Sequence, residues 1–146
     1  MRDSIDQNAP VVVDRGIAID AQLEKVWALL TDVPSWPRWQ PDITFAEAAG
    51  SLRKNRAFRW STGGLDIEST VYTIEAPHRI LWGGAAYGIE GIHSWTLEPD
   101  GDTVRVRTEE SWDGPPVLAD VTGMQAALEE SLTAWLGHLK RAAERP

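Results

Sequence analysis

The sequence predicts an α+β domain in which an antiparallel sheet packs against one long C-terminal helix. Two features of the chain point to this class. Between residues 43 and 112, strand-type segments alternate with short turn sequences. After Pro115-Pro116, apolar residues recur at helical spacing over one long stretch. Short turns favour antiparallel neighbours, and the long helix is then expected to lie across one face of the sheet.

The N-terminal part of the chain predicts one strand followed by two short helices. Residues 1–10 lack periodicity and are expected to fray, whereas residues 11–19 are rich in β-branched side chains and form a strand. Asp20 can cap a first helix, whose apolar positions are Leu23, Val26, Trp27 and Leu30. A second helix is expected from residue 36 to about residue 40, where Pro41 ends it.

About six strands and the long helix complete the domain. The strands are separated by five turn sequences: Gly50-Ser51, Gly63-Gly64, Ala76-Pro77, Tyr87-Gly88 and Asp100-Gly101. The helix carries one apolar stripe: Val117, Val121, Met124, Leu128, Leu132, Trp135 and Leu139. The chain has no internal repeat and no long linker, so residues 11–146 are expected to form a single domain.

The turn sequences also predict the register of the strands. A two-residue turn at Gly63-Gly64 places Trp60 opposite Ile67 on a dry face and Arg59 opposite Glu68 on a wet face. The other turns predict these pairs: Ile74 with Arg79, Thr73 with Ile80, Val71 with Trp82, Trp82 with His93, Glu98 with Thr103, Leu97 with Val104, Trp95 with Val106, His93 with Thr108, and Ile89 with Trp112. A solvated outer set follows: Arg105, Arg107, Glu109 and Ser111. Successive hairpins agree on one inner face, which supports the assignment.

Composition and charge limit the class of protein. The 146 residues are 42% hydrophobic and 25% charged, as is ordinary for one globular domain. The net charge of −8 speaks against nucleic acids and anionic membranes as partners. Without cysteine, the chain has no disulfide and no thiolate chemistry, and its three separated histidines lack the spacing of a metal site. The absence of a leader and of a long apolar run predicts a cytoplasmic protein without a membrane span, either a monomer or a homodimer.

Several segments resemble the polyketide cyclase/dehydrase-like branch of the START-like (SRPBCC) superfamily. They are IAIDA at 17–21, VWALLTDV at 26–33, WPRWQP at 36–41, HSWTL at 93–97, TV at 103–104 and EESWDG at 109–114. The resemblance covers roughly residues 11 to 143. It implies a helix-grip (START/Bet v 1-like) fold, in which a curved antiparallel sheet of about seven strands surrounds the long C-terminal helix. It also implies two short helices after the first strand and a cavity between sheet and helix.

Eight tryptophans are an unusual number for this length, and four of them fall on the predicted inner face. They either line a cavity for a large apolar ligand or only pack against the long helix, and the resemblance favours the cavity. The predicted cavity residues are Trp39, Phe58, Trp60, Ser69, Val71, Trp82, His93, Trp95, Thr108, Glu110, Trp112, Met124 and Leu128. Trp36 and Trp39 either close the entrance or pack against the first helix.

His93 and Glu110 are the candidate catalytic residues, because the predicted register makes them diagonal neighbours on the inner face with Thr108 between them. They could move protons, orient a ligand, or form a buried structural pair. Aromatase/cyclases of the superfamily use inward-pointing polar groups including arginine, and Arg56, at a strand end, is the single candidate here.

Three functions follow from this reading of the chain. The leading hypothesis is binding of a hydrophobic small molecule (lipid, polyketide or aromatic) without metal or cofactor. A polyketide cyclase or dehydratase that uses His93 and Glu110 is the second hypothesis. The third is a protein-interaction module, as in the co-chaperone branch of the superfamily, which predicts a filled interior and an exposed apolar patch.

Overall fold

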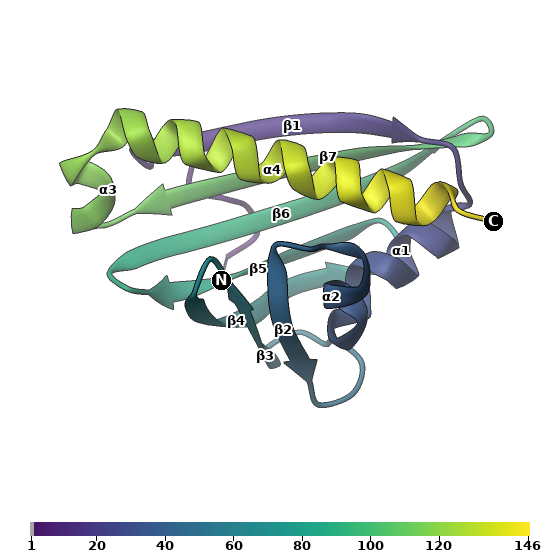
Figure 1. Ribbon diagram of the computed structural model, residues 1–146, viewed down its shortest axis with the longest axis horizontal. Coiled ribbons are helices and arrows are strands. Elements are labelled where there is room, and N and C mark those ends of the chain that lie inside the picture. The colour runs from purple at the N-terminus through teal and green to yellow at the C-terminus, as the bar shows by residue number, and fades with distance from the viewer. Residues whose placement is uncertain (1) are drawn as a thin grey trace.

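A computed structural model describes residues 2–146 of the chain and shows the predicted order of elements (Figure 1). The strands are β1 Val11–Ile19, β2 Ile43–Ala48, β3 Ala57–Thr62, β4 Leu65–Glu75, β5 Arg79–Ala86, β6 Ile89–Asp100 and β7 Thr103–Asp113. The helices are α1 Leu23–Thr31, a 3-10 turn η1 Val33–Ser35, α2 Trp36–Trp39, α3 Pro115–Ala119 and α4 Val121–Glu144. The long helix is thus interrupted at Asp120, whose side chain accepts a hydrogen bond from the Gly123 amide (3.0 Å) and caps α4.

One antiparallel sheet of seven strands holds the fold together, in the order β1-β7-β6-β5-β4-β3-β2. The sheet curves, and α4 lies along its inner side next to β1 and β7 (Figure 1). The short helices α1 and α2 pack near the C-terminal half of α4. This is the helix-grip arrangement that the resemblance implied. The core therefore lies between the inner face of the sheet and the apolar stripe of α4.

The predicted register of the β3–β4 hairpin is confirmed. Thr62 pairs with Leu65, Trp60 with Ile67, and Arg59 with Glu68. The β5–β6 hairpin also follows the prediction, since it turns at Tyr87-Gly88 and pairs Trp82 with His93. In both hairpins a two-residue turn with positive φ values leaves little freedom for a slip.

The predicted register at the start of the β4–β5 hairpin is wrong by one residue. Ile74 pairs with Ile80 instead of Arg79, and Thr73 pairs with Leu81 instead of Ile80. A bulge between Val71 and Thr73 absorbs the extra residue, so the predicted pair of Val71 with Trp82 is nevertheless present.

The predicted register of the β6–β7 hairpin is wrong by two residues. The chain turns at Gly101-Asp102, which pairs Asp100 with Thr103. The observed pairs that replace the prediction are Glu98 with Arg105, Leu97 with Val106, Trp95 with Thr108, His93 with Glu110, and Gly91 with Trp112. Ile89 therefore does not face Trp112. A shift of two residues leaves every side chain on its predicted face.

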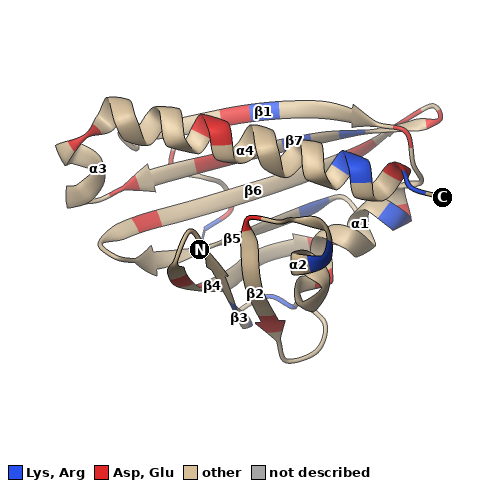
Figure 2. Ribbon diagram, viewed as in Figure 1, with Lys and Arg blue, Asp and Glu red and all other residues tan. Residues whose placement is uncertain are grey.

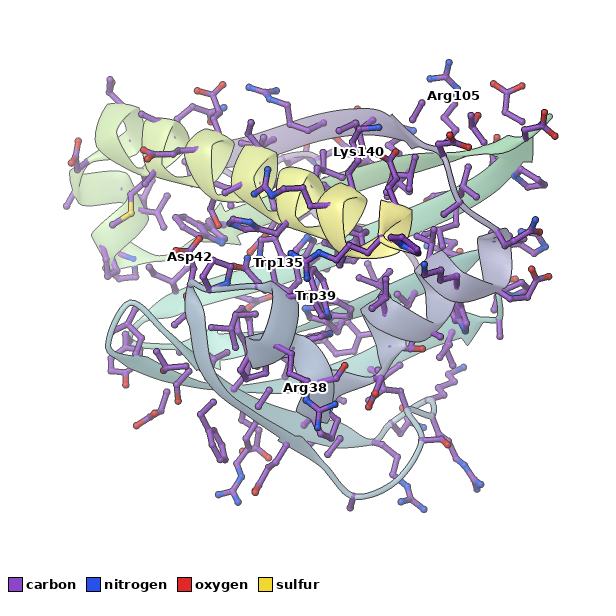
Figure 3. The ribbon with its side chains drawn as sticks, turned by 45° about the vertical axis from the view of Figure 1, so that its right-hand side comes forward. Arg38, Trp39, Asp42, Arg105, Trp135 and Lys140 are labelled. Atoms are coloured by element: carbon purple, nitrogen blue, oxygen red, sulfur yellow. The ribbon has the colours of Figure 1, made fainter. Side chains whose placement is uncertain are left out.

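The outer face of the sheet is partly covered by the N-terminal segment. Residues 2–10 were expected to fray, but Ile5 is only 5% exposed and packs with Leu81 and Ile92. The backbone amide of Asp6 donates to the Ser111 hydroxyl (3.0 Å), and Ser111 is buried where a solvated residue was predicted. The rest of the predicted outer set faces outward, and Figure 3 shows Arg105 pointing away from the core.

Candidate functional site

The inner face of the sheet is hollow where its residues are small. Along β5 the inward positions change from Trp82 to Gly84 and Ala86, and along β6 from His93 to Gly91. None of the three small residues reaches the helix. A cavity of about 300 Å³ is therefore left between this end of the sheet and the middle of α4.

Seven of the predicted cavity residues line this space: Trp60, Ser69, Trp82, His93, Glu110, Trp112 and Leu128. They come from β3, β4, β5, β6, β7 and α4, so the register of the whole curved sheet brings them together. Most of the wall is apolar or aromatic, and His93 and Glu110 bring the two titratable groups that lie together in it.

The other six predicted residues lie outside the cavity wall. Phe58, Val71, Trp95 and Thr108 are all at most 2% exposed and pack within the core. Met124 is half-buried on α4. Trp39 packs on Trp135, with ring centroids 5.9 Å apart (Figure 3). Phe58, Val71 and Trp95 belong to the same buried core cluster as Trp39, beside the cavity and not in its wall.

Trp36 is the centre of an aromatic cluster and does not lie at an entrance. It is fully buried, and its indole Nε1 donates to the Leu30 carbonyl of α1 (3.1 Å). Its ring contacts four others at centroid distances of 5.3–5.9 Å: Phe58, Trp60, Trp82 and Trp135. The tryptophans therefore serve two purposes, since Trp60, Trp82 and Trp135 belong both to this cluster and to the cavity wall.

Sequence reasoning missed a polar corner of the site after α2. Gln40 is 2% exposed and lines the cavity, and its Oε1 accepts from the Asp42 amide (2.9 Å). Asp42 also lines the cavity and lies 3.8 Å from His138 Nε2 of α4. Figure 3 shows Asp42, Trp39 and Trp135 gathered where this loop meets the helix.

Tyr87 was taken only as a turn residue, but it also lines the cavity. It sits at the β5–β6 turn with a φ of 54°, and its hydroxyl accepts from the Asp66 amide of the neighbouring hairpin (3.0 Å). More than half of its surface is exposed, and Leu65 beside it is 44% exposed. Together they form an apolar rim between the two turns.

His93 and Glu110 face one another directly on β6 and β7. Their separation is 3.2 Å from His93 Nδ1 to Glu110 Oε1. On its other side, His93 Nε2 lies 2.7 Å from the Thr108 hydroxyl. The second carboxyl oxygen of Glu110 accepts from the Trp112 indole N–H (2.7 Å). The pair is therefore held from both ends.

The hydrogen-bond partners show which atoms of Thr108, His93 and Glu110 carry the protons. Thr108 donates its hydroxyl hydrogen to the Ser94 carbonyl (3.1 Å), so its oxygen must accept from His93 Nε2–H. A neutral His93 then has a lone pair on Nδ1. One proton consequently lies between that nitrogen and Glu110 Oε1, and a protonated Glu110 can supply it.

Burial supports the same assignment. Desolvation lowers the pKa of His93 to about 3, because the imidazolium has lost its water. Desolvation also raises the pKa of Glu110 to about 7, although the hydrogen bond from Trp112 acts in the opposite direction. Near neutral pH the cavity therefore holds a neutral imidazole beside a carboxyl group that retains a proton in a large part of the molecules.

Within residues 2–146, no group of three His, Asp or Glu side chains is placed to hold a metal ion. Nor does any helix in that range have the length and apolar character needed to cross a membrane.

Comparison with known proteins places the chain in a family. Residues 10–144 match the family described as polyketide cyclase/dehydrase and lipid transport. The chain belongs to this family. Among curated proteins, none matches the sequence.

Several solved structures share the fold at low sequence identity. A hypothetical protein from Helicobacter pylori is 22% identical, with a TM-score of 0.84 over 99% of this chain and 98% of the other. The Zhui aromatase/cyclase from Streptomyces is 17% identical, with a TM-score of 0.79 over 92% and 93%. A START superfamily protein from Mycobacterium smegmatis is 15% identical, with a TM-score of 0.68 over 90% and 98%. These likenesses support the START-like helix-grip fold.

Proposed function

We propose that the protein binds a hydrophobic small molecule in the cavity between the sheet and α4. The observation that carries this proposal is an aromatic-walled space of about 300 Å³ that remains beside a tightly packed core. Buried aliphatic and aromatic side chains fill the rest of the interior, so the empty space is a local feature of the fold. It coincides with three small inward residues, Gly84, Ala86 and Gly91, in an otherwise bulky inner face.

Burial of apolar surface is the source of affinity in this proposal. Each Å² of apolar ligand surface removed from water contributes about 25 cal/mol before the costs of association. The indole rings of Trp60, Trp112 and Trp135 offer flat apolar surfaces to such a ligand. Glu110 then orients the polar groups of the ligand, because its carboxyl oxygens lie in the wall and can accept further hydrogen bonds.

A second candidate function is a cyclase or dehydratase reaction in the same cavity. Its supporting observation is that His93 and Glu110 share one proton in an apolar site, as an acid–base pair requires. A relative of the same fold is an aromatase/cyclase by name. The test is turnover: a cyclase loses product formation in Glu110→Gln, whereas a carrier keeps its ligand.

A protein-interaction module is the least supported of the three functions. That hypothesis predicts a filled interior, which the cavity does not fit. The exposed large apolar residues come from separate elements: Phe45, Leu65, Tyr87, Leu118 and Val121. Two of them, Leu65 and Tyr87, belong to the cavity wall, and their exposure follows from their position at the rim of the cavity.

Gly91→Leu is expected to block the cavity without unfolding the protein. An added Cβ would meet its nearest neighbours, atoms of Trp112 and Glu110, at 3.5–3.7 Å, which is ordinary van der Waals contact. The rest of the leucine side chain then occupies the ligand's space. The neutral two-ring fluorophore 1-naphthylamine is expected to bind at least about tenfold more weakly, as measured by fluorescence titration.

The matched control is Glu98→Leu, which adds the same side chain to an exposed position of β6. It is expected to bind the fluorophore as the natural chain does. Both variants should keep the denaturation midpoint of the natural chain within a few degrees. Equal binding by the Gly91→Leu variant and the natural chain would place the fluorophore elsewhere and refute the proposal.

A further inference from the structure

We propose that the cavity selects uncharged molecules of about one or two rings that carry a hydroxyl or N–H group and donate its hydrogen to Glu110. This inference rests on the proposed function and adds the chemical class of the ligand. Three properties of the wall lead to it: its charge, its inventory of hydrogen-bond donors, and its volume.

The charge of the wall excludes anionic ligands. Among the described residues that line the cavity there is no lysine and no arginine, while two carboxyl groups, Asp42 and Glu110, are present. On α4 the basic residues Lys140 and Arg141 lie beyond Trp135 toward the C-terminal end, and Figure 2 shows acidic residues along the first half. A buried carboxylate or phosphate on the ligand would meet no compensating charge, which makes its desolvation unfavourable.

The donors beside Glu110 are already engaged within the protein. The Trp112 indole donates to Glu110, His93 donates to Thr108, and the Thr108 hydroxyl donates to a backbone carbonyl. The proton between Glu110 and His93 is shared by those two groups. The carboxyl group therefore offers a ligand its remaining lone pairs, and a lone pair recognises a donor.

A polar ligand group that has no hydrogen to donate cannot form this hydrogen bond with Glu110. An ether or carbonyl oxygen placed against Glu110 would bring lone pairs against lone pairs and leave both unpaired in an apolar site. Leaving a buried polar group unpaired is more costly than the hydrogen bond is favourable, so discrimination against such ligands is expected to be large.

The volume limits the size of the ligand. About 300 Å³ is at the small end of known ligand pockets. It suits a compound of one or two rings better than a polycyclic chain or a diacyl lipid. The flat indole surfaces of Trp60, Trp112 and Trp135 favour an aromatic ring over a branched aliphatic group.

Three naphthalene derivatives of the same ring size test the inference. 2-Naphthol has a donor, 2-methoxynaphthalene has an oxygen without one, and 2-naphthoate is an anion at pH 7. Their affinities are measured by displacement of 1-naphthylamine from the natural chain. Naphthol is expected to bind at least about tenfold more tightly than each of the other two.

Glu110→Gln provides the matched variant for this experiment. The glutamine carbonyl can accept from Trp112 while one amide hydrogen is donated to His93 Nδ1, so the network is kept. Its second amide hydrogen then faces the cavity and can be donated to the methoxy oxygen. The preference for naphthol over methoxynaphthalene is expected to fall to about threefold or less. Glu109→Gln, the neighbouring residue with its side chain on the other face of β7, should retain the full preference.

The outcomes separate this inference from the proposed function. If methoxynaphthalene or naphthoate binds the natural chain as tightly as naphthol, the ligand class is wrong while the cavity remains a binding site. If Glu110→Gln keeps the full preference, Glu110 is not the acceptor and the inference fails. If none of the aromatic compounds binds, or if Gly91→Leu binds them unchanged, the proposed function itself fails.

Discussion

Replacing Glu110 with glutamine is expected to stabilise the protein relative to the natural chain as the pH rises from about 4 to 8. The reason is that the natural chain has to ionise a buried carboxyl group over this range. Its pKa is raised from 4.5 to about 7 in the folded protein, so the folded state binds more protons than the unfolded state between these values. The contribution of Glu110 to stability is therefore present below pH 4.5 and lost as the pH rises through 7.

The size of this effect follows from the pKa change. At about 1.4 kcal/mol for each pKa unit, the loss in the natural chain amounts to about 3 kcal/mol. Glutamine does not ionise, and the Glu110→Gln variant escapes this loss. Urea denaturation at several pH values gives the difference in unfolding free energy between the two chains, and that difference should rise by about this amount.

His93 is common to both chains and acts in the other direction. Its folded pKa is depressed to about 3, so its contribution to stability is present above pH 6.5 and is lost as the pH falls toward 3. Both chains contain His93 with a hydrogen-bonding side chain at position 110. The contribution of His93 therefore cancels when their unfolding free energies are compared. The control Glu109→Gln, on the outer face, should show no comparable rise. Parallel curves for the natural chain and Glu110→Gln would mean that Glu110 is ionised as in water.

Replacing Trp36 with alanine is expected to cost about 3–5 kcal/mol of unfolding free energy. The side chain is fully buried, and it stands in contact with four aromatic rings from β3, β5 and α4. Its removal leaves a large cavity and also deletes the indole hydrogen bond to Leu30. Chemical denaturation measures the loss of unfolding free energy. A variant that is already unfolded without denaturant would also agree with this prediction.

The control for Trp36 is Trp27→Ala on α1. Trp27 is half-buried and packs against the edge of the core, so the expected loss is clearly smaller. A second variant, Trp36→Phe, keeps an aromatic ring in the cluster and should recover part of the stability. An unfolding free energy of Trp36→Ala equal to that of Trp27→Ala would contradict the central position of Trp36.

The sheet and its inner face could be predicted because hairpins leave two independent signals in a sequence. A Gly-Gly or Tyr-Gly turn sets the register, and the alternation of wet and dry residues checks it, as with Arg59 opposite Glu68. A slip of two residues in the β6–β7 hairpin did not disturb the prediction of faces, because side chains alternate with a period of two.

Other features of the fold leave no local pattern. The bulge between Val71 and Thr73 depends on how the following turn closes, and a propensity pattern does not report it. The segment around Ile5 carries a single large apolar residue, too little for a periodic signal, yet it covers part of the outer face. The packing of residues 2–10 is decided by the distant partners Leu81 and Ile92.

Of the residues that line the cavity, the sequence predicted the polar pair and about a third of the whole wall. His93 and Glu110 stood out because they are titratable residues among apolar ones on a face that two hairpins defined. The boundary of the cavity was not predictable, since it depends on which inward residues α2 and α4 cover. Gln40 and Asp42 were not predicted for the same reason, because their place in the wall follows from the packing of α2 against α4.

A crystal structure of the protein with 2-naphthol would test the central claim most directly. We expect the naphthalene ring inside the cavity, against the indoles of Trp112 and Trp135, with the hydroxyl oxygen within about 3 Å of a Glu110 carboxyl oxygen. Density for ordered water alone in the cavity, with naphthol bound only at the surface, would contradict it.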